Sequence, residues 1–570
     1  MIVALVSFII VAGLPTNIQV CRELVRRVRG WRTEPIRHHR LTAAPGLIFC
    51  GILAFILLGV FFWPVKEIAN YNYALNVLGA IVALLVLPPL YCWCQAAGEW
   101  LASRRRWVRP VFLCVTLVIA FVVQLRVGLA MQVAPGWDAS AIEESAFGVA
   151  DGSMRTIYDF FPLYPNNLML IVALTRYSQT MLAWGIGPDG LLYSAVVLNC
   201  VVLTATVLLV YLCARRILHE GAAVFTLIPA VVFIVFSPYI PVVYSDTLGI
   251  IFPVLLLYLH LTALRVTHWY WKVLLWIAIG AVTAVGFNLK PTAAFAGVAI
   301  LGVYVLQYLL GRTTQRRQKL KVVVVVLVTT MVGFVGMNAA VWADIRSQSY
   351  IGFNVAENTR AVPWTHFLAM GATGMGAFTQ SDVNATIAIS DPAVRFQHGL
   401  DLYGQRVVQM GFPGYLQFLD GKAVWTFGDG SFHAWGEGTL LAQKDPFPVR
   451  DPLSSDIQSY LWGNGDNYAV TTGIWQSCWL AMLILVAVPL RVRTPRLLTS
   501  PAAIMRWSLL ALTLFLLFFE TRSRYLYLYV PYFILLATLT LDALRPKQGS
   551  GHRAGLKPTA DTSRGQAVAN

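Results

Sequence analysis

The chain has 570 residues, of which 57% are apolar and only 12% are charged, whereas an ordinary soluble domain has roughly 25% charged residues. This composition excludes a soluble globular enzyme, a disordered protein and a disulfide-rich secreted scaffold. Long apolar runs recur from one end of the chain to the other, and they do not alternate with polar residues as barrel strands would. We therefore expect an all-α polytopic membrane protein.

The formal net charge is +16, from 43 basic and 27 acidic residues. The basic residues cluster in short segments between apolar runs, which is typical of cytoplasmic loops under the positive-inside rule. No basic face with interleaved aromatic residues is present, so we expect no nucleic-acid partner. The eight cysteines lie in or beside apolar runs and are expected to be free thiols.

The apolar runs predict about 13 or 14 membrane-spanning helices. They are roughly residues 2–20, 44–64, 74–97, 111–131, 167–187, 190–213, 222–238, 246–265, 270–288, 293–310, 322–343, 472–492, 504–520 and 526–543. Arginine-rich segments at 22–40, 104–109, 312–321 and 491–496 are expected inside. Segments 132–166 and 344–471 then lie outside, and the second, about 125 residues long, is expected to form a mixed extracytoplasmic domain.

Five regions follow from this division. Residues 1–110 would add extra helices before a transmembrane core at 111–343. The outer domain at 344–471 separates this core from C-terminal helices at 472–543, and 544–570 is expected to be a disordered cytoplasmic tail.

The number of membrane crossings between the run 111–131 and Arg215-Arg216 is inconsistent. If 111–131 runs outward and Arg215-Arg216 lie inside, an odd number of crossings must separate them, yet 167–187 and 190–213 both look apolar enough to span. Either one run is re-entrant or lies in the membrane plane, or Arg215-Arg216 lie outside. The run 167–187 contains Arg176-Tyr177-Ser178-Gln179, which suits a helix that dips without crossing.

The first outer segment offers candidate acids. Asp138 follows an outward helix by about seven residues, so its carboxylate would lie near the outer membrane face, where it could act as a general base. Trp137 suits an interfacial position, and Tyr164 begins the return to the membrane. Glu143 and Glu144 are alternative bases, and a solvated loop acid is the simpler interpretation of any one of them.

Cations recur in two short outer turns, against the positive-inside bias. Lys290 lies in one turn, and Arg522 and Arg524 lie in the other. A lipid phosphate at headgroup level would bind all three, because arginine forks bind phosphate oxygens. Glu520 could hold an arginine in place, and Tyr525 closes the turn. The alternatives are a snorkelling lysine and a Glu–Arg pair that only stabilises the hairpin.

The large outer segment contains tryptophans near acids and histidines, as in a cleft that stacks on sugars. His366 and Asp429 are candidate substrate-binding residues, although aromatic packing of a small domain explains them equally well. The histidines are too few and too scattered to predict a metal site.

At these residues the chain resembles the GT-C superfamily of integral-membrane glycosyltransferases, and it is most similar to bacterial protein O-mannosyltransferases and lipid A aminoarabinose transferases. The resemblance covers roughly 111–543. It rests on the following features: Trp137-Asp138, Tyr164-Pro165, Lys290 after a Gly-rich helix, Glu520-x-Arg522-x-Arg524-Tyr525, the segment Pro363–Asp382 and the segment Lys422–Gly430.

The resemblance implies a GT-C-like bundle at the cell membrane and a sugar donor linked to a polyprenyl phosphate. Asp138 would match the catalytic base, and Lys290, Arg522 and Arg524 would bind the departing phosphate. The acceptor would be an envelope polymer, a glycolipid or a protein, with membrane lipids around the chain and neither cofactor nor metal required. Two other interpretations remain: a transporter or lipid flippase, for which Arg126 and Arg176 are the notable charges, and a non-catalytic envelope assembly protein.

Overall fold

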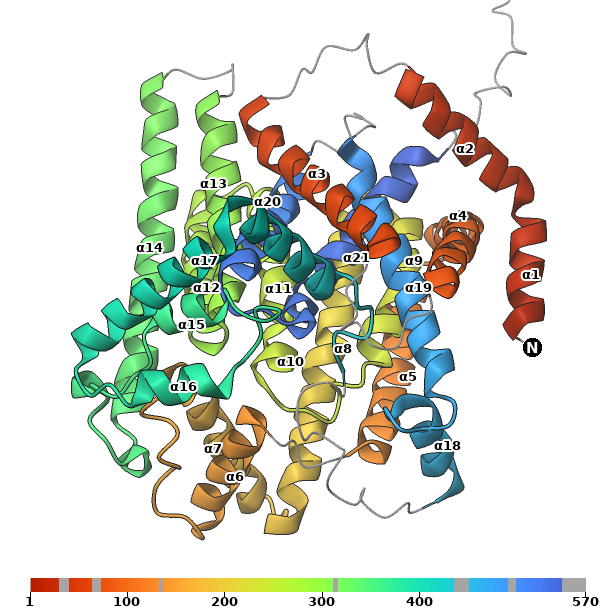
Figure 1. Ribbon diagram of the computed structural model, residues 1–570. Helices are drawn as coiled ribbons and strands as arrows, with labels where there is room; N and C mark the ends of the chain where they lie inside the picture. Colours follow the sequence, from red (N-terminus) through yellow and green to blue (C-terminus); the bar gives the residue numbers. More distant parts are fainter. Residues whose placement is uncertain are drawn as a thin grey trace, which may run out of the picture.

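The computed structural model describes residues 2–29, 40–63, 73–132, 137–310, 316–434, 451–490 and 499–545 (Figure 1). Every regular element in these ranges is a helix, and none is a strand. Eleven helices are long and apolar enough to cross a membrane. The expected all-α polytopic architecture is confirmed.

The candidate spans run through most of the chain. They are α3 (Arg40–Phe62), α4 (Tyr73–Ser103), α5 (Val108–Ala130), α8 (Leu191–Ile217), α10 with α11 (Ser245–Gly249 and Ile251–Ala263), α12 (Trp269–Leu289), α13 (Ala294–Leu310), α14 (Arg316–Arg346), α19 (Tyr468–Ala487), α20 (Ser500–Phe518) and η10 with α21 (Ser523–Tyr529 and Val530–Leu544).

The described residues contain fewer candidate spans than the 13 or 14 expected. Helices α1 (Ile2–Ala12) and α2 (Leu14–Arg29) meet at a 62° bend, and counting them as one span would bring the total to 12. Helix α7 (Leu168–Ala183) has 16 residues, and α9 (Glu220–Ala230) with the π-helical turn η4 (Val231–Val235) is also short. A 16-residue helix measures about 24 Å, less than the roughly 30 Å of a hydrocarbon core.

The short helix α7 resolves the crossing problem. It packs on α6 (Asp138–Asp151), and Arg176 pairs with Asp344 near the far end of α14. Helix α7 therefore stays at the end of the bundle where α6 begins, as Figure 1 shows. Only α8 then separates Asp138 from Arg215-Arg216, which lie at opposite ends of the bundle.

Helix α21 forms the centre of the bundle. Every residue from Val530 to Leu544 is buried, and two tyrosines, Tyr532 within the helix and Tyr529 directly before it, join neighbouring elements by hydrogen bonds. The Tyr532 hydroxyl donates to the Pro253 carbonyl at 2.7 Å, and the Tyr529 hydroxyl donates to the Thr292 carbonyl at 2.8 Å. Because the segment Ser523–Tyr529 leads directly into this central helix, its one charged residue, the buried Arg524, has a fixed position in the bundle.

The segment 344–471 was expected to be a mixed domain, but its described part contains only helices. They are η6 (Ser349–Ile351), η7 (Val355–Glu357), α15 (Trp364–Met370), α16 (Gln380–Ile387), α17 (Pro392–Phe427) and α18 (Pro452–Leu461). Helix α17 breaks at Gly411, where φ is +63° and glycine is favoured.

The last turns of α17 pack against membrane spans. The Trp63 indole N–H donates to Asp420 at 2.7 Å, and the Trp479 indole N–H donates to the Phe427 carbonyl at 2.7 Å. This part of the segment is therefore anchored in the bundle. The predicted tail beyond Arg545, the arginine cluster at 491–496 and parts of the clusters at 22–40 and 312–321 lie outside the described residues.

Candidate functional site

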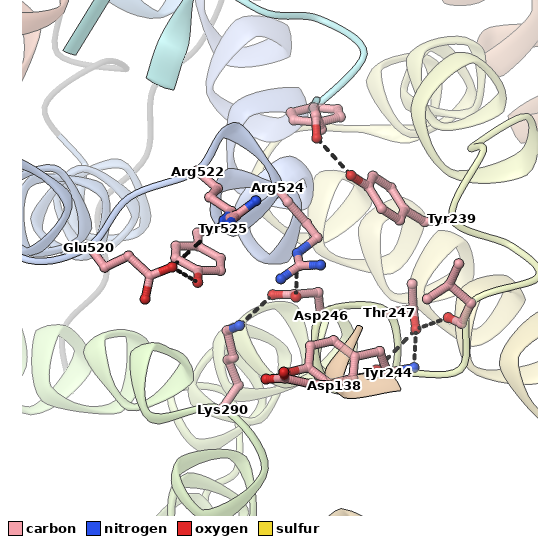
Figure 2. A network of polar contacts seen from close by, with 12 residues as sticks. Asp138, Tyr239, Tyr244, Asp246, Thr247, Lys290, Glu520, Arg522, Arg524 and Tyr525 are labelled. Atoms are coloured by element: carbon pink, nitrogen blue, oxygen red, sulfur yellow. Dashed lines mark hydrogen bonds and ion pairs between the residues drawn. The ribbon is translucent and has the colours of Figure 1, made fainter. Parts of the chain in front are cut away.

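Charged side chains from four segments meet where α6 and α10 begin, where α12 ends and where η10 starts (Figure 2). Sequence reasoning placed most of them on one side of the membrane, and the structure brings them together. We call this group the acid–cation centre and define it as Asp138, Asp246, Lys290, Glu520, Arg522 and Arg524.

Asp246 lies at the middle of the centre, although it is not among the residues predicted from the sequence. Its Oδ1 is 2.8 Å from Lys290 Nζ, and its Oδ2 is 3.1 Å from Arg524 Nε. Asp246 is 1% exposed and Arg524 is 5% exposed, so water screens these ion pairs weakly. The sequence did contain a signal for Asp246: it is an acidic residue at the start of an apolar run. A charge in that position is costly in a membrane unless it has a partner.

Local backbone structure fixes the position of Asp246. The Thr247 hydroxyl accepts from the Tyr244 backbone N–H at 3.1 Å and donates to the Val242 carbonyl at 2.8 Å. These two bonds hold the backbone at the start of α10, so Asp246 enters the centre from the first helical turn.

Aromatic rings cover the cations. The Arg524 guanidinium carbon lies 3.9 Å from the centre of the Trp137 ring, and Lys290 Nζ lies 4.4 Å from the Tyr525 ring. Trp137 also packs edge-on against Tyr244, with ring centres 4.7 Å apart. These cation–π contacts restrict both cations and exclude water from their apolar sides.

Asp138 is the carboxylate of the centre that is held least tightly by ion pairs. Its Oδ2 accepts from the Tyr244 hydroxyl at 3.4 Å, whereas Asp246 is the acid that contacts Lys290 and Arg524. Burial raises the pKa of Asp138, and the nearby Arg524 and Lys290 charges oppose this shift. A carboxylate with a raised pKa beside fixed cations is suited to proton transfer.

Glu520 and Arg522 form the remaining pair, with 3.6 Å between Glu520 Oε1 and Arg522 Nε. The Tyr525 hydroxyl donates to the same oxygen at 3.4 Å. The local Glu–Arg interaction considered from the sequence is thus present, and it lies beside the Asp246 pairs (Figure 2). Three carboxylates and three cations balance the charge of the centre.

Tyr164 is near the centre, but Glu143 and Glu144 have other environments. Burial raises the pKa of Tyr164 to about 12, and the nearby carboxylates of Asp138 and Glu520 add to this shift. Burial raises the pKa of Glu143 to about 8, and the Val243 backbone N–H opposes this shift. Glu144 is exposed and accepts from Ser140 and Tyr158 at 2.9 Å.

His366 and Asp429 have structural contacts of their own. His366 is buried in α15, its Nδ1 lies 2.7 Å from the Thr386 hydroxyl, and burial lowers its pKa to about 4. Asp429 accepts from the backbone N–H groups of Ser431 and His433, both at 2.8 Å, and so shapes a tight loop. Within the described ranges no three acidic, histidine or cysteine side chains are grouped as a metal site.

Lys422 supports the centre from α17. Its fully buried ammonium donates at 2.6 Å to the Gly371 carbonyl and at 2.6 Å to the Phe519 carbonyl, directly before Glu520. Gly376 lets the lysine approach, because a Cβ there would lie 2.4 Å from Lys422 Cε and the residue has a φ of +73°. Lys422 therefore fixes the entry to the turn that carries Arg522 and Arg524.

Comparison with known proteins identifies a family. A family model described as "Conserved hypothetical integral membrane protein" matches residues 65–544, which include the acid–cation centre and all the spans from α4 onward. No curated protein and no solved structure matches the chain. Because the match covers most of the sequence, the chain belongs to this family of conserved integral membrane proteins.

Proposed function

We propose that the chain is a membrane glycosyltransferase that moves a sugar from a polyprenyl-phosphate donor to an acceptor hydroxyl at the outer face of the cell membrane. The observation that carries this proposal is the convergence of Asp138 with Lys290 and Arg524 in one largely buried centre. Such a transfer needs a base for the acceptor hydroxyl and cations for the departing phosphate.

In this mechanism Asp138 takes the proton of the acceptor hydroxyl as its oxygen attacks the anomeric carbon. The bond from that carbon to the phosphate oxygen breaks, and its electron pair leaves with the polyprenyl phosphate. Attack opposite the leaving group inverts the anomeric configuration. Lys290 and Arg524 stabilise the charge that develops on the phosphate.

Asp246 holds these two cations before the donor arrives. An ammonium has three N–H donors and a guanidinium has five, so each cation can keep a contact to Asp246 and also bind a phosphate oxygen. Asp246 thus acts as a positioning residue. The donor would supply the negative charge that the centre, neutral by itself, stabilises during bond cleavage.

Transport receives no specific support from the charges that suggested it. Arg126 pairs with Asp451 at 2.6 Å and donates to Ser454, which joins the end of α5 to α18. Arg176 pairs with Asp344 at the same end of the bundle. Both arginines hold helix ends together, so the glycosyltransferase proposal is preferred.

The test compares sugar transfer by membranes that contain the wild-type chain or Asp138→Asn. Radiolabelled polyprenyl-phosphate sugars serve as donors and an envelope extract serves as the acceptor. Asp151→Asn is the matched control, because Asp151 ends the same helix, is exposed, and contacts only a nearby backbone N–H in the described structure. Accumulation of each variant is measured in parallel.

We expect transfer by the wild type and by Asp151→Asn, and a loss of at least about a hundredfold for Asp138→Asn. Equal transfer by Asp138→Asn would exclude Asp138 as the base, and Glu143→Gln and Glu144→Gln would be tested next. No transfer by the wild type with a broad panel of donors would contradict the proposed reaction.

A further inference from the structure

A polar cavity lies at the opposite end of α5 from the acid–cation centre. It has a volume of about 430 Å³ and lies between the turn that joins α4 to α5 and the last turn of α8. Helices α5 and α8 pack along each other (Figure 1). Four arginines line the cavity, and we call it the arginine pocket: Arg104, Arg106, Arg109 and Arg215.

Three of these arginines are fixed by the protein. Arg109 Nη2 donates to the Ala102 carbonyl at 2.9 Å, the Arg104 guanidinium lies 4.7 Å from the centre of the Trp100 ring, and Arg215 Nε lies 3.0 Å from Glu220. No hydrogen bond or ion pair joins Arg106 to another residue that the structure describes. Most of the guanidinium N–H groups are therefore available to a ligand.

The pocket has an excess of positive charge. Among the described residues no aspartate or glutamate lines it. Glu220, which does not line the cavity, pairs with Arg215 and also accepts from the Tyr211 hydroxyl. The remaining guanidinium groups repel one another unless an anion is bound between them.

The N-terminus of α5 adds to this field. The helix begins after Trp107 without a side-chain cap, and its first turn has no acidic residue. Its positive end thus meets the cavity beside Arg109 and Pro110. Charge and helix direction favour the same ligand, an anion.

The positive-inside rule explains why arginines occur in this turn, but it does not require them to share one cavity. Arg105 provides an internal comparison. It lies in the same exposed turn and carries the same charge, yet it does not line the pocket. The convergence of its neighbours is a structural feature beyond loop composition.

We propose that the arginine pocket binds a phosphate group. Arginine forks bind phosphate oxygens bidentately, and basic pockets between helices at the cytoplasmic side are suited to anionic headgroups. The phosphate belongs either to a membrane lipid or to a free anion, and the chemistry of recognition is the same. This proposal is independent of the transfer reaction proposed for the other end of the bundle.

The experiment uses the full chain purified in maltoside micelles. One arm adds phosphatidylglycerol or phosphatidylcholine, and the other adds inorganic phosphate or chloride at equal ionic strength. Binding is measured by native mass spectrometry and by the shift of the thermal midpoint. The variants are Arg106→Gln, the double variant Arg104→Gln with Arg106→Gln, and the matched control Arg105→Gln.

We expect the wild type and Arg105→Gln to bind phosphatidylglycerol equally, and Arg106→Gln to bind about tenfold more weakly. Binding of the lipid alone assigns the site to a headgroup, and binding of inorganic phosphate as well assigns it to the phosphate itself. If the double variant fails to fold, Arg106→Gln decides, because its described side chain makes no contact that folding needs.

Two results would overturn the proposal. Equal weakening by Arg105→Gln and Arg106→Gln would mean that general surface charge attracts the anion. Equal binding of phosphatidylglycerol by the wild type, Arg106→Gln and the double variant, together with no effect of inorganic phosphate, would mean that the pocket binds no phosphate group.

Discussion

Asp246 and Arg524 lie 3.1 Å apart, from Oδ2 to Nε, and this contact joins the first turn of α10 to η10. Both residues are almost fully buried. A buried charge that loses its partner costs far more than an exposed one, because it cannot recover its hydration. The pair is therefore part of the fold as well as part of the proposed site.

Asp246→Asn is expected to destabilise the protein by on the order of 3–5 kcal/mol, since it leaves Lys290 and Arg524 buried without their common counter-ion. The thermal midpoint in detergent measures this loss. Asp189→Asn is the control, because Asp189 is an exposed acid at a helix start. Adding Lys290→Met to Asp246→Asn removes one uncompensated charge and should recover part of the stability. Unfolding of Asp246→Asn at the wild-type midpoint would contradict this account.

The rate of sugar transfer should decrease at low pH, because Asp138 becomes protonated and can no longer act as the base. Burial raises the pKa of Asp138, so this decline lies at higher pH than for an ordinary carboxyl, while Arg522 is among the cations that oppose the shift. Arg522→Gln removes an opposing charge and should move the acid limb to still higher pH. The pH profile of the initial transfer rate measures both effects.

A control for that profile is Arg346→Gln, which removes a charge at the end of α14 that is absent from the groups acting on Asp138. Its acid limb should coincide with that of the wild type. An acid limb that moves to lower pH in Arg522→Gln would mean that another group controls the rate.

Part of the site could be predicted because charged residues are rare in membrane segments, so each one next to an apolar run is informative. Asp138, Lys290, Arg522 and Arg524 all stand at the ends of apolar runs, where the positive-inside rule assigns a side to each. Asp246 was not predicted as a site residue because the sequence Tyr244-Ser245-Asp246 is typical of an ordinary helix start. Its importance depends on two partners that are distant in sequence, and spacing alone could not reveal them.

The described residues contain fewer candidate spans than expected for a related reason. The run 167–187 is apolar because α7 buries residues such as Leu170, Ile171 and Leu174 against other helices. Hydropathy does not distinguish burial in protein from burial in lipid. The length of α7 and its Arg176–Asp344 pair decide the matter, and both are features of the fold.

Lys422 should make stability depend on pH. Burial lowers its pKa to about 7, opposed by Glu520, whereas the unfolded chain keeps the ordinary value near 10.5. Between these values only the unfolded state binds the proton, so the free energy of unfolding rises with pH across this window. Lys422→Met should lose this contribution.

The measurement is the change in thermal midpoint between pH 7 and pH 9 for the two proteins. Lys422→Met also leaves the Gly371 and Phe519 carbonyls without their donor, which lowers its midpoint at every pH. The slope therefore isolates the titration from the lost hydrogen bonds. Parallel slopes in the two proteins would contradict a lowered pKa for Lys422.

The close packing of α12 on α14 gives a prediction that does not involve the proposed reaction. A Cβ added at Gly333 would lie 2.0 Å from the Ile277 carbonyl oxygen, whereas a Cβ at Gly336 would meet nothing within 4 Å. Both glycines lie within α14, so the change to alanine brings the same gain of helix propensity, about 1 kcal/mol in an aqueous helix.

Gly333→Ala must push the two backbones apart and is expected to lower stability by roughly 1–3 kcal/mol, while Gly336→Ala should be neutral or slightly stabilising. Thermal midpoints and accumulation in membranes measure the difference between these two variants. The Asn288 side chain donates to Asn338 at 2.9 Å and joins the same helix pair, so separation of the backbones at Gly333 would also strain this bond. Equal stability of the two alanine variants would mean that α12 and α14 do not approach as closely as their glycines allow.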